Sequence, residues 1–351
     1  MIAASAAETA FRALANARIL VKDGPYGTAV QALNLVEADY RGKLTTNHDQ
    51  KGNNDILNLT RPDAIAGIGR SYIESGADLL ATNTFNANAI SQADYGTEGL
   101  VREINLAAAR ILRAEIDRAS AEDGRPRFLA GALGPTNKTL SLSPKVEDPG
   151  YREVDFDGMK GVYREQIDAL LEGGVDFILI ETVFDTLNAK AAAFAAMEAE
   201  EALGRRVPIM LSMTLTDLAG RNLSGQTVEA FWVSLEHVRP ITIGLNCSFG
   251  ATELRPHVQI LAKSVDTLLM VYPNAGLPNE FGGYDELPDT TGRLIRDWAE
   301  AGLINAVGGC CGTTPAHIAA IAGAVAGLPP REPPVREPAL RLSGLEASVF
   351  V

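Results

Sequence analysis

The 351-residue sequence contains only three cysteines and four histidines, and aromatic residues make up 6% of it. An odd number of cysteines in so long a chain argues against a disulfide framework and leaves catalysis, metal binding or core packing as their roles. The histidines show no H-x3-H or similar spacing, so we expect them to be structural or at the surface. They are His48, His237, His257 and His317.

The sequence also lacks an excess of basic residues and any long apolar run. Its 31 Lys and Arg against 44 Asp and Glu give a net charge of −13, which makes nucleic acid a poor candidate partner. No window approaches about 18 uninterrupted apolar residues, and the first twenty residues lack a basic start followed by an apolar block. We therefore expect a cytoplasmic protein without a membrane span or signal peptide, which binds small molecules or other proteins.

Short β-branched or aliphatic runs alternate with segments whose apolar residues have helical spacing. Parallel strands joined by helical crossovers explain this alternation, because a tight turn cannot close a parallel pair. The predicted strands are Ile19–Val21, Leu79–Thr82, Phe128–Ala132, Phe177–Ile180, Ile209–Met213, Ile241–Leu245, Leu268–Val271 and Ile304–Val307. The predicted helices are Ala64–Ser75, Leu100–Ala119, Phe156–Glu172, Leu187–Leu203, Val228–His237, Leu254–Lys263, Thr291–Ala301 and Pro315–Ala326.

Eight strands suit a closed barrel, although periodicity alone leaves a doubly wound open sheet possible. Nearly every predicted strand is followed by polar or glycine-containing residues, such as Asp23-Gly24 after the first and Gly134-Pro135 after the third. Barrel enzymes build their sites at this carboxyl face. We therefore predict an α/β fold, a (β/α)8 TIM barrel with its site at the carboxyl ends of the strands.

Two insertions and a tail depart from the minimal repeat. Residues 26–61 after the first strand and 136–155 after the third are rich in polar residues and glycine, and we expect long loops that cover the barrel mouth. The residues before Ile19 predict an alanine-rich helix that plugs the barrel bottom. We expect one domain over 1–328, followed by a proline-rich tail or linker remnant over 329–351. This tail is predicted to dock on the barrel or a partner through Leu340, Leu342, Leu345 and Val349.

The three cysteines fall at the carboxyl ends of two predicted strands. Cys247 ends the sixth strand, and the adjacent Cys310 and Cys311 end the eighth. In a barrel one strand separates these two, so their ends lie within roughly 10 Å at ~4.8 Å per strand. Two consecutive cysteines can face one centre only where the chain leaves extended geometry, which Gly308-Gly309 and Gly312 allow. The spacing therefore predicts that three sulfurs can converge.

Three thiolates suit Zn²⁺, which prefers tetrahedral sulfur-rich sites and would keep a fourth position for water or substrate. A substrate thiol in that position would lose its proton at neutral pH, whereas a free thiol with a pKa near ~8.5 stays mostly protonated. The bound sulfur would keep electron density, which predicts thiol alkylation. Two alternatives stay open at this point: an iron–sulfur cluster with one open iron, and free cysteines that pack as small hydrophobes.

Two motifs surround the cysteines, GLNCS at Gly244–Ser248 and INAVGGCCGTTP at Ile304–Pro315. Five more are GNNDILNLTRPD at Gly52–Asp63, ATNTFNAN at Ala81–Asn88, GALGPTNKTLS at Gly131–Ser141, ETVFDTLNAKAA at Glu181–Ala192 and NAGLPNEFGGYD at Asn274–Asp285. In this order the motifs resemble the homocysteine S-methyltransferase family over about residues 18–330. They are most similar to the homocysteine-binding module of cobalamin-dependent methionine synthase.

The resemblance implies a (β/α)8 barrel, a zinc ion bound by Cys247, Cys310 and Cys311, and the homocysteine sulfur as fourth ligand. The three cysteines would act in catalysis through zinc. Asp23 and Glu181 would hold the homocysteine amino group, because two carboxylates can pair with one ammonium. A salt bridge or helix cap at the barrel rim is the alternative role for both carboxylates.

The other predicted substrate-binding residues are Gly24, Thr82, Asn83 and Asn246. Asn246 would orient the sulfur or contact the ligand, with backbone hydrogen bonding as its alternative role. The helix that begins near Thr314 is expected to offer amide groups to the homocysteine carboxylate. The sequence departs from the family pattern at Pro25-Tyr26, where the family often has small or sulfur-bearing residues.

The resemblance leaves the methyl donor open. Members of the family use methylcobalamin, betaine, a dimethyl sulfonium compound or S-methylmethionine. Betaine-type members have a tyrosine directly after the glutamate, whereas Thr182 follows Glu181 here, which favours the cobalamin-linked branch. We therefore expect a zinc-dependent enzyme that forms methionine by attack of zinc-bound homocysteine thiolate on methylcobalamin. Because 351 residues leave no room for folate- and cobalamin-binding modules, a partner polypeptide would carry the cobalamin. A betaine- or sulfonium-dependent enzyme and a non-catalytic zinc- and homocysteine-binding subunit are the alternatives.

Overall fold

The computed structural model describes residues 2–350. Met1, where the expected domain begins, and Val351, where the expected tail ends, lie outside the described residues. Parallel strands form a sheet with the order β1-β9-β8-β6-β5-β4-β3-β2, and β7 also pairs with β8. The strands are β1 (Leu20–Val21), β2 (Leu79–Ala81), β3 (Phe128–Leu133), β4 (Phe177–Val183), β5 (Ile209–Met213), β6 (Thr242–Ile243), β7 (Asn246–Gly250), β8 (Leu268–Asn274) and β9 (Ala306–Val307).

The sheet closes on itself between its first and last strands. Lys22 forms a parallel bridge with Leu79, and the Asp23 N–H donates to the Leu79 carbonyl at 2.9 Å. β6 and β7 are two parts of one strand position, since Leu245 between them bridges Met213 of β5. Over residues 2–350 the barrel therefore has eight strand positions, which confirms the predicted (β/α)8 TIM barrel.

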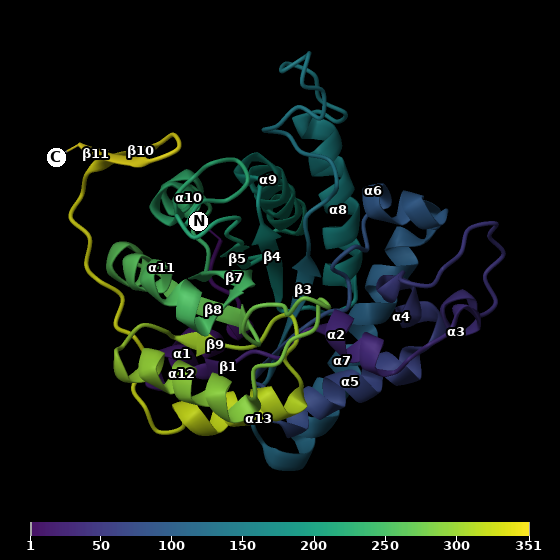
Figure 1. Ribbon diagram of the computed structural model, residues 1–351, viewed down its shortest axis with the longest axis horizontal. Helices are drawn as coiled ribbons and strands as arrows, with labels where there is room; N and C mark the ends of the chain where they lie inside the picture. The colour runs from purple at the N-terminus through teal and green to yellow at the C-terminus, as the bar shows by residue number, and fades with distance from the viewer. Residues whose placement is uncertain (1, 351) are drawn as a thin grey trace.

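A crossover helix follows each strand position and covers the outside of the barrel (Figure 1). Local sequence fixes several helix starts: Asp155, Asp185 and Thr227 cap α8, α9 and α10 with side-chain oxygens. Within residues 2–350 no helix combines the length and the apolar content needed to cross a membrane. The crossover helices are α5 (Pro62–Glu74), α7 (Val101–Asp123), α8 (Phe156–Glu172), α9 (Thr186–Leu203), α10 (Val228–Leu235), α11 (Ala251–Ser264), α12 (Pro288–Glu300) and α13 (Pro315–Val325).

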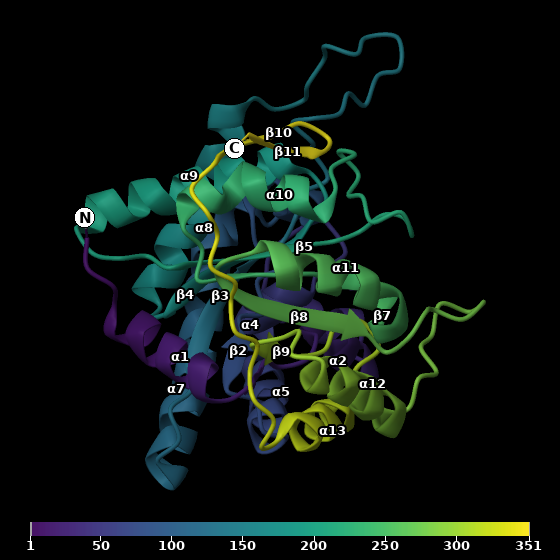
Figure 2. The same cartoon turned by 90° about the vertical axis from the view of Figure 1, so that its left-hand side faces the viewer.

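The amino-terminal end of the barrel is closed by α1 (Ala6–Ala17), as predicted (Figure 2). Phe11 of this helix is fully buried and packs edge-on against Phe128 and Phe177, with ring centroids 5.3 and 5.2 Å apart. Those two rings begin β3 and β4. The apolar floor of the barrel leaves its opposite, carboxyl end for polar groups.

The insertion over 26–61 is helical, so the expectation of a long loop was wrong there. It contains α2 (Tyr26–Ala32), α3 (Glu37–Arg41) and α4 (Leu57–Thr60), with a short 3-10 turn before α4. Buried apolar residues such as Ile56 and Leu57 anchor it, and α4 packs on α7. The second insertion, 136–155, does lack helices and strands and projects from the barrel (Figure 1).

The tail over 329–351 ends in an antiparallel hairpin, β10 (Leu340–Ser343) and β11 (Ala347–Phe350). The hairpin docks on α10 through polar groups: Ser343 Oγ donates to the Ala230 carbonyl at 2.7 Å. The prediction of apolar docking on the barrel was wrong, because each of the four side chains named for it is more than half exposed, and docking on a partner stays a prediction. These side chains are Leu340, Leu342, Leu345 and Val349.

Candidate metal and substrate site

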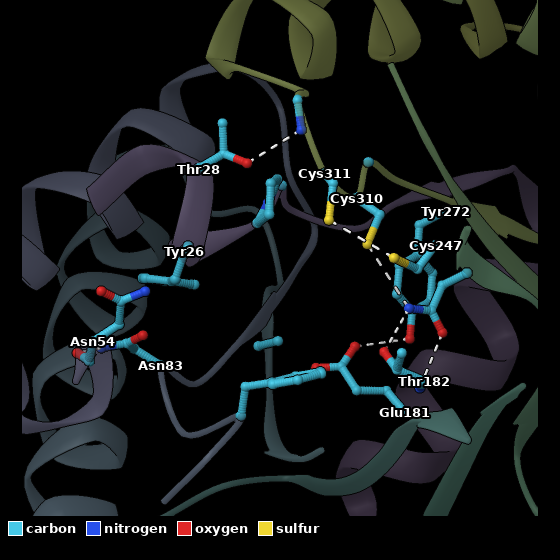
Figure 3. A pocket seen from close by; sticks show the side chains of 18 of the residues that line it. Tyr26, Thr28, Asn54, Asn83, Glu181, Thr182, Cys247, Tyr272, Cys310 and Cys311 are labelled. Carbon is cyan, nitrogen blue, oxygen red and sulfur yellow. Dashed lines mark hydrogen bonds between the residues drawn. The ribbon is translucent and has the colours of Figure 1, made fainter. Parts of the chain in front are cut away.

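A cavity of about 570 Å³ opens at the carboxyl ends of the strands and contains most of the predicted site residues (Figure 3). The cysteines lie at one end of it, and Tyr26, Asn54 and Asn83 lie at the other. The predicted residues that line the cavity are Gly24, Thr82, Asn83, Glu181, Asn246, Cys247, Cys310 and Cys311. The cavity thus brings together chain segments more than two hundred residues apart.

The three cysteine sulfurs converge, as the sequence predicts. The Sγ atoms of Cys247, Cys310 and Cys311 all lie within 4.8 Å of one another, and those of Cys247 and Cys311 are 3.7 Å apart. That separation is far too long for a disulfide. It is close to the edge of about 3.8 Å that four sulfurs make around a tetrahedral Zn²⁺ with Zn–S bonds of about 2.3 Å.

Unusual backbone conformations bring the sulfurs together. Cys247 and Ser248 have φ of +62° and +61°, which turns the Cys247 side chain out of the regular alternation of β7. Gly312 has φ of +79°, and an added Cβ there would lie 2.3 Å from the Tyr284 ring. Gly309 is equally restricted, because its added Cβ would lie 2.2 Å from Thr313 Oγ1. The glycines around the cysteine pair are therefore required by conformation and space, as predicted.

The three thiols differ as acids. Hydrogen bonds from Cys247, which has the larger effect, and from Cys310 lower the pKa of Cys311 to about 3. Hydrogen bonding with Cys247 and Cys311 raises the pKa of Cys310 well above its ordinary value. The cluster therefore stabilises one thiolate and keeps protons on its neighbours. A cation that prefers sulfur would replace those protons, so this donor set fits Zn²⁺.

Glu181 faces the cavity next to the sulfur cluster. It sits near the carboxyl end of β4, is 9% exposed, and its Oε2 accepts a hydrogen bond of 2.9 Å from the Tyr272 hydroxyl. Burial raises the pKa of Glu181, and the nearby Lys22 charge opposes that rise. The carboxylate is therefore placed to accept a cationic group from a ligand in the cavity.

Asp23 does not reach the cavity. It is fully buried; its Oδ1 accepts from Lys22 Nζ at 2.7 Å and its Oδ2 from the Ala81 N–H at 2.9 Å. Lys22, which the sequence analysis did not name, lines the cavity instead. Gly24 does line it, and an added Cβ there would lie 2.7 Å from the Tyr72 ring. The structure therefore places a lysine where a second carboxylate was expected.

The amide of Asn246 connects the cysteines to β4 and β5. Its Oδ1 accepts from Ser212 Oγ at 2.6 Å and from the Thr182 N–H at 3.1 Å. Its Nδ2 donates to Thr182 Oγ1 at 2.8 Å and lies 3.8 Å from Cys310 Sγ. This arrangement agrees with an orienting role next to the sulfur cluster.

Thr82 and Asn83 use their polar groups within the fold. Thr82 Oγ1 accepts from the Ala132 N–H at 2.9 Å, and Asn83 Nδ2 donates to the Asn54 carbonyl at 2.8 Å. The start of α13 is also occupied, because the Thr314 N–H donates to His317 Nδ1 at 3.2 Å in a capping box. Residues 313–317 do not line the cavity, so the expected use of this helix start for a carboxylate finds no support.

A second carboxylate, Asp55, lines the far part of the cavity. Its Oδ1 accepts from the Asn86 N–H at 3.0 Å. Burial raises the pKa of Asp55 to about 7, and the Asn86 bond only partly opposes this. The ionised form is therefore less stable in the folded protein than in the unfolded chain, where the pKa is about 3.9.

Replacing Asp55 with asparagine should stabilise the protein at pH 8 and do so less than half as much at pH 5. A carboxyl group with a raised folded pKa stabilises the fold below pH ~4 and loses that contribution progressively as the pH rises from there through about 7. The full loss is up to about 4 kcal/mol of unfolding free energy, at 1.36 kcal/mol per pKa unit. Urea unfolding at both pH values measures it, with the exposed Asp94→Asn as control. Equal effects of Asp55→Asn at pH 5 and pH 8 would contradict the prediction.

Comparison with known proteins agrees with this geometry. The sequence model described as homocysteine S-methyltransferase matches residues 20–325. The chain belongs to the homocysteine S-methyltransferase family. Membership supports methylation of homocysteine as the activity.

Solved structures of the homocysteine methyltransferase MmuM from Escherichia coli share the fold of this family member. The oxidised form has a TM-score of 0.69 at 22% sequence identity, covering 87% of this chain and 95% of that one. The metallated form has a TM-score of 0.67 at 23% identity, covering 89% and 98%. At these identities the likeness establishes the barrel fold alone.

Among the cavity residues that the sequence analysis did not assign to the site are Lys22, Asp55 and Tyr272. A signal existed for Lys22, because a lysine directly after the apolar run Ile19–Val21 is unusual on a barrel strand. Asp55 lies in a motif that was quoted without being assigned a role. Tyr272 continues an apolar strand, where an inward tyrosine cannot be told from a core residue.

Proposed function

We propose that this chain transfers a methyl group to the sulfur of homocysteine and so forms methionine, with Zn²⁺ held by Cys247, Cys310 and Cys311. The observation that carries the proposal is the convergence of three sulfurs beside Glu181 in one cavity. When bound there, Zn²⁺ would lower the pKa of the homocysteine thiol and fix its sulfur as the fourth ligand. Three reduced cysteines fit a reducing compartment, and we propose that the protein is cytoplasmic.

Glu181 and Asn246 would position the substrate in this proposal. The Glu181 carboxylate would accept the homocysteine ammonium, and the Tyr272 hydroxyl holds that carboxylate in place. Hydrogen bonds to Ser212 and Thr182 fix the Asn246 amide, which would orient the sulfur end of the substrate. Holding both ends of a short ligand lowers the cost of aligning its sulfur with a methyl carbon.

The reaction joins the homocysteine sulfur to the methyl carbon while the bond from that carbon to the donor breaks. The donor leaves with the bonding electron pair, and the thiol proton passes to solvent. We propose methylcobalamin on a separate cobalamin- and folate-binding polypeptide as donor, because Thr182 follows Glu181. A donor with an onium group, such as betaine or a sulfonium compound, is the second candidate. Tyr26 and the buried Asp55 both line the cavity and would be available to contact that group.

A donor panel tests the proposal. Zinc-loaded protein and homocysteine are incubated with methylcobalamin, betaine, a dimethyl sulfonium compound or S-methylmethionine, with and without a cobalamin-domain polypeptide, and methionine is measured. Turnover with methylcobalamin, raised by the added polypeptide, supports the first candidate. Turnover with an onium donor alone supports the second. Absence of methionine with every donor, despite bound zinc and homocysteine, would overturn methyl transfer and leave a binding subunit.

A further inference from the structure

Lys22 places a positive charge at an inward position of the barrel. In β1, Leu20 belongs to the apolar cluster around Phe11 inside the barrel, and Lys22 lies two residues further along the same face. The Lys22 side chain is 5% exposed, and it lines the cavity that contains the cysteines and Glu181. A buried lysine at such a position needs counter-charges, and it has them.

The contacts of Lys22 hold its ammonium beside Glu181. Its Nζ donates to Asp23 Oδ1 at 2.7 Å and lies 4.6 Å from the centroid of the Tyr272 ring. The hydroxyl of that same tyrosine donates to Glu181 Oε2 at 2.9 Å. Lys22 and Glu181 thus both contact Tyr272, one at the ring and one at the hydroxyl.

The ammonium of Lys22 keeps capacity for a further acceptor. Among residues 2–350, Asp23 is its one hydrogen-bond acceptor, although an ammonium has three N–H groups. Burial lowers the pKa of Lys22, but the charges of Asp23 and Glu181 outweigh burial and raise it, so the group stays protonated. Asp23 cannot turn away, because the Ala81 N–H holds its other oxygen.

The resulting pair of charges matches the α-amino acid group. A zwitterionic amino acid carries an ammonium and a carboxylate on the same carbon, and the cavity presents a carboxylate, Glu181, and an ammonium, Lys22, around one tyrosine. Lys22, Asp23 and Glu181 together carry a net charge of −1. Glu181 can therefore balance the ammonium of a ligand. A ligand carboxylate needs its own positive partner, which Lys22 supplies.

We propose that Lys22 binds the α-carboxylate of the substrate and makes the site selective for thiols that carry a complete amino acid group. This rests on the proposed function, in which Glu181 takes the ammonium and the cysteine cluster takes the sulfur end. Asp23 then acts as a positioning residue that aims the Lys22 ammonium, and does not touch the substrate.

Calorimetric binding to zinc-loaded protein tests the proposal with three ligands. They are L-homocysteine, 3-aminopropane-1-thiol, which lacks the carboxylate, and 4-sulfanylbutanoate, which lacks the amine. For Lys22→Met we expect affinity for homocysteine and for 4-sulfanylbutanoate to fall about ten- to a hundredfold, the range for loss of a hydrogen bond to a charged group. Affinity for 3-aminopropane-1-thiol should not fall, because this ligand has no carboxylate for Lys22 to bind and loss of the nearby positive charge does not oppose its ammonium.

Further variants separate carboxylate binding from a general loss of structure. Lys22→Arg should recover most of the homocysteine affinity. The double variant Lys22→Met/Asp23→Asn leaves no buried aspartate unpaired. We expect it to show the same order of ligand affinities as Lys22→Met, with a native circular dichroism spectrum. Equal losses for homocysteine and 3-aminopropane-1-thiol would overturn the proposal, even where the wild type forms methionine. Conversely, a Lys22-dependent preference for homocysteine in a protein that forms no methionine would support Lys22 and overturn the proposed reaction.

Discussion

Replacing Cys311 with serine is expected to remove tightly bound zinc and to lower kcat/KM for homocysteine methylation by about a thousandfold or more. A serine hydroxyl stays protonated at neutral pH and is a poor ligand for Zn²⁺, so two thiolates would remain. The two remaining sulfurs, of Cys247 and Cys310, come from separate strand ends and cannot complete a tetrahedron with one substrate thiol. Zinc per chain by mass spectrometry and methionine formation are the two measurements.

Ser248→Ala is the matched control for this change. Ser248 follows Cys247, shares its positive φ, and its hydroxyl bonds to Thr214 Oγ1 at 2.8 Å without belonging to the sulfur cluster. We expect this variant to keep one zinc per chain and most of the activity. If Cys311→Ser retained stoichiometric zinc and wild-type turnover, the sulfur cluster would not be the metal site.

The sulfur cluster could be predicted from sequence because its geometry depends on short-range features. Three cysteines at two strand ends, with glycines beside the adjacent pair, leave few arrangements in a parallel barrel. The structure adds what spacing cannot give, namely the positive φ of Cys247 and Ser248. A non-glycine residue in that region is unusual, so no sequence rule would place it there.

The barrel itself was predictable for a related reason. Eight apolar runs alternate with helical segments, and the observed strands overlap every predicted one. The insertion over 26–61 was not, because its helices are only four to seven residues long, too short for a periodic apolar pattern to stand out. The hairpin at Leu340–Phe350 was missed likewise, since its polar docking on α10 depends on tertiary contacts.

The positions of Lys22 and Asp23 differ from those that the family resemblance implies, because Lys22 lines the cavity and Asp23 does not. Resemblance assigned Asp23 to the substrate amine, but the alternation of β1 places Lys22 on the inward face and leaves Asp23 buried beside it. β1 is only two residues long, and Lys22 and Asp23 follow it directly. Which of these two side chains faces the cavity therefore depends on the backbone direction at a single position. Glu181 near the end of the longer β4 is not subject to this ambiguity, and its predicted exposure to the cavity agrees with the structure.

Replacing Glu181 with glutamine is therefore expected to weaken homocysteine binding more than any other single substitution outside the cysteines. The amide keeps the size of the side chain but removes the charge that would pair with the homocysteine ammonium in a buried cavity. Removing one partner of a buried charged pair costs about 3–5 kcal/mol, which corresponds to about a hundredfold to a few thousandfold in kcat/KM. We expect most of the loss in KM for homocysteine, with one zinc per chain retained.

Tyr272→Phe is the control that separates the charge of Glu181 from its orientation. It removes the hydroxyl that donates to Glu181 Oε2 but keeps both the carboxylate and the ring beneath Lys22 Nζ. Loss of one such hydrogen bond to a charged group costs about ten- to a hundredfold, and we expect a value near the lower end, below the effect of Glu181→Gln, because the carboxylate keeps its charge. Steady-state kinetics with varied homocysteine gives both values. An unchanged KM in Glu181→Gln would show that the amine binds elsewhere, whereas equal losses in the two variants would assign the effect to geometry, because only one of them removes the negative charge.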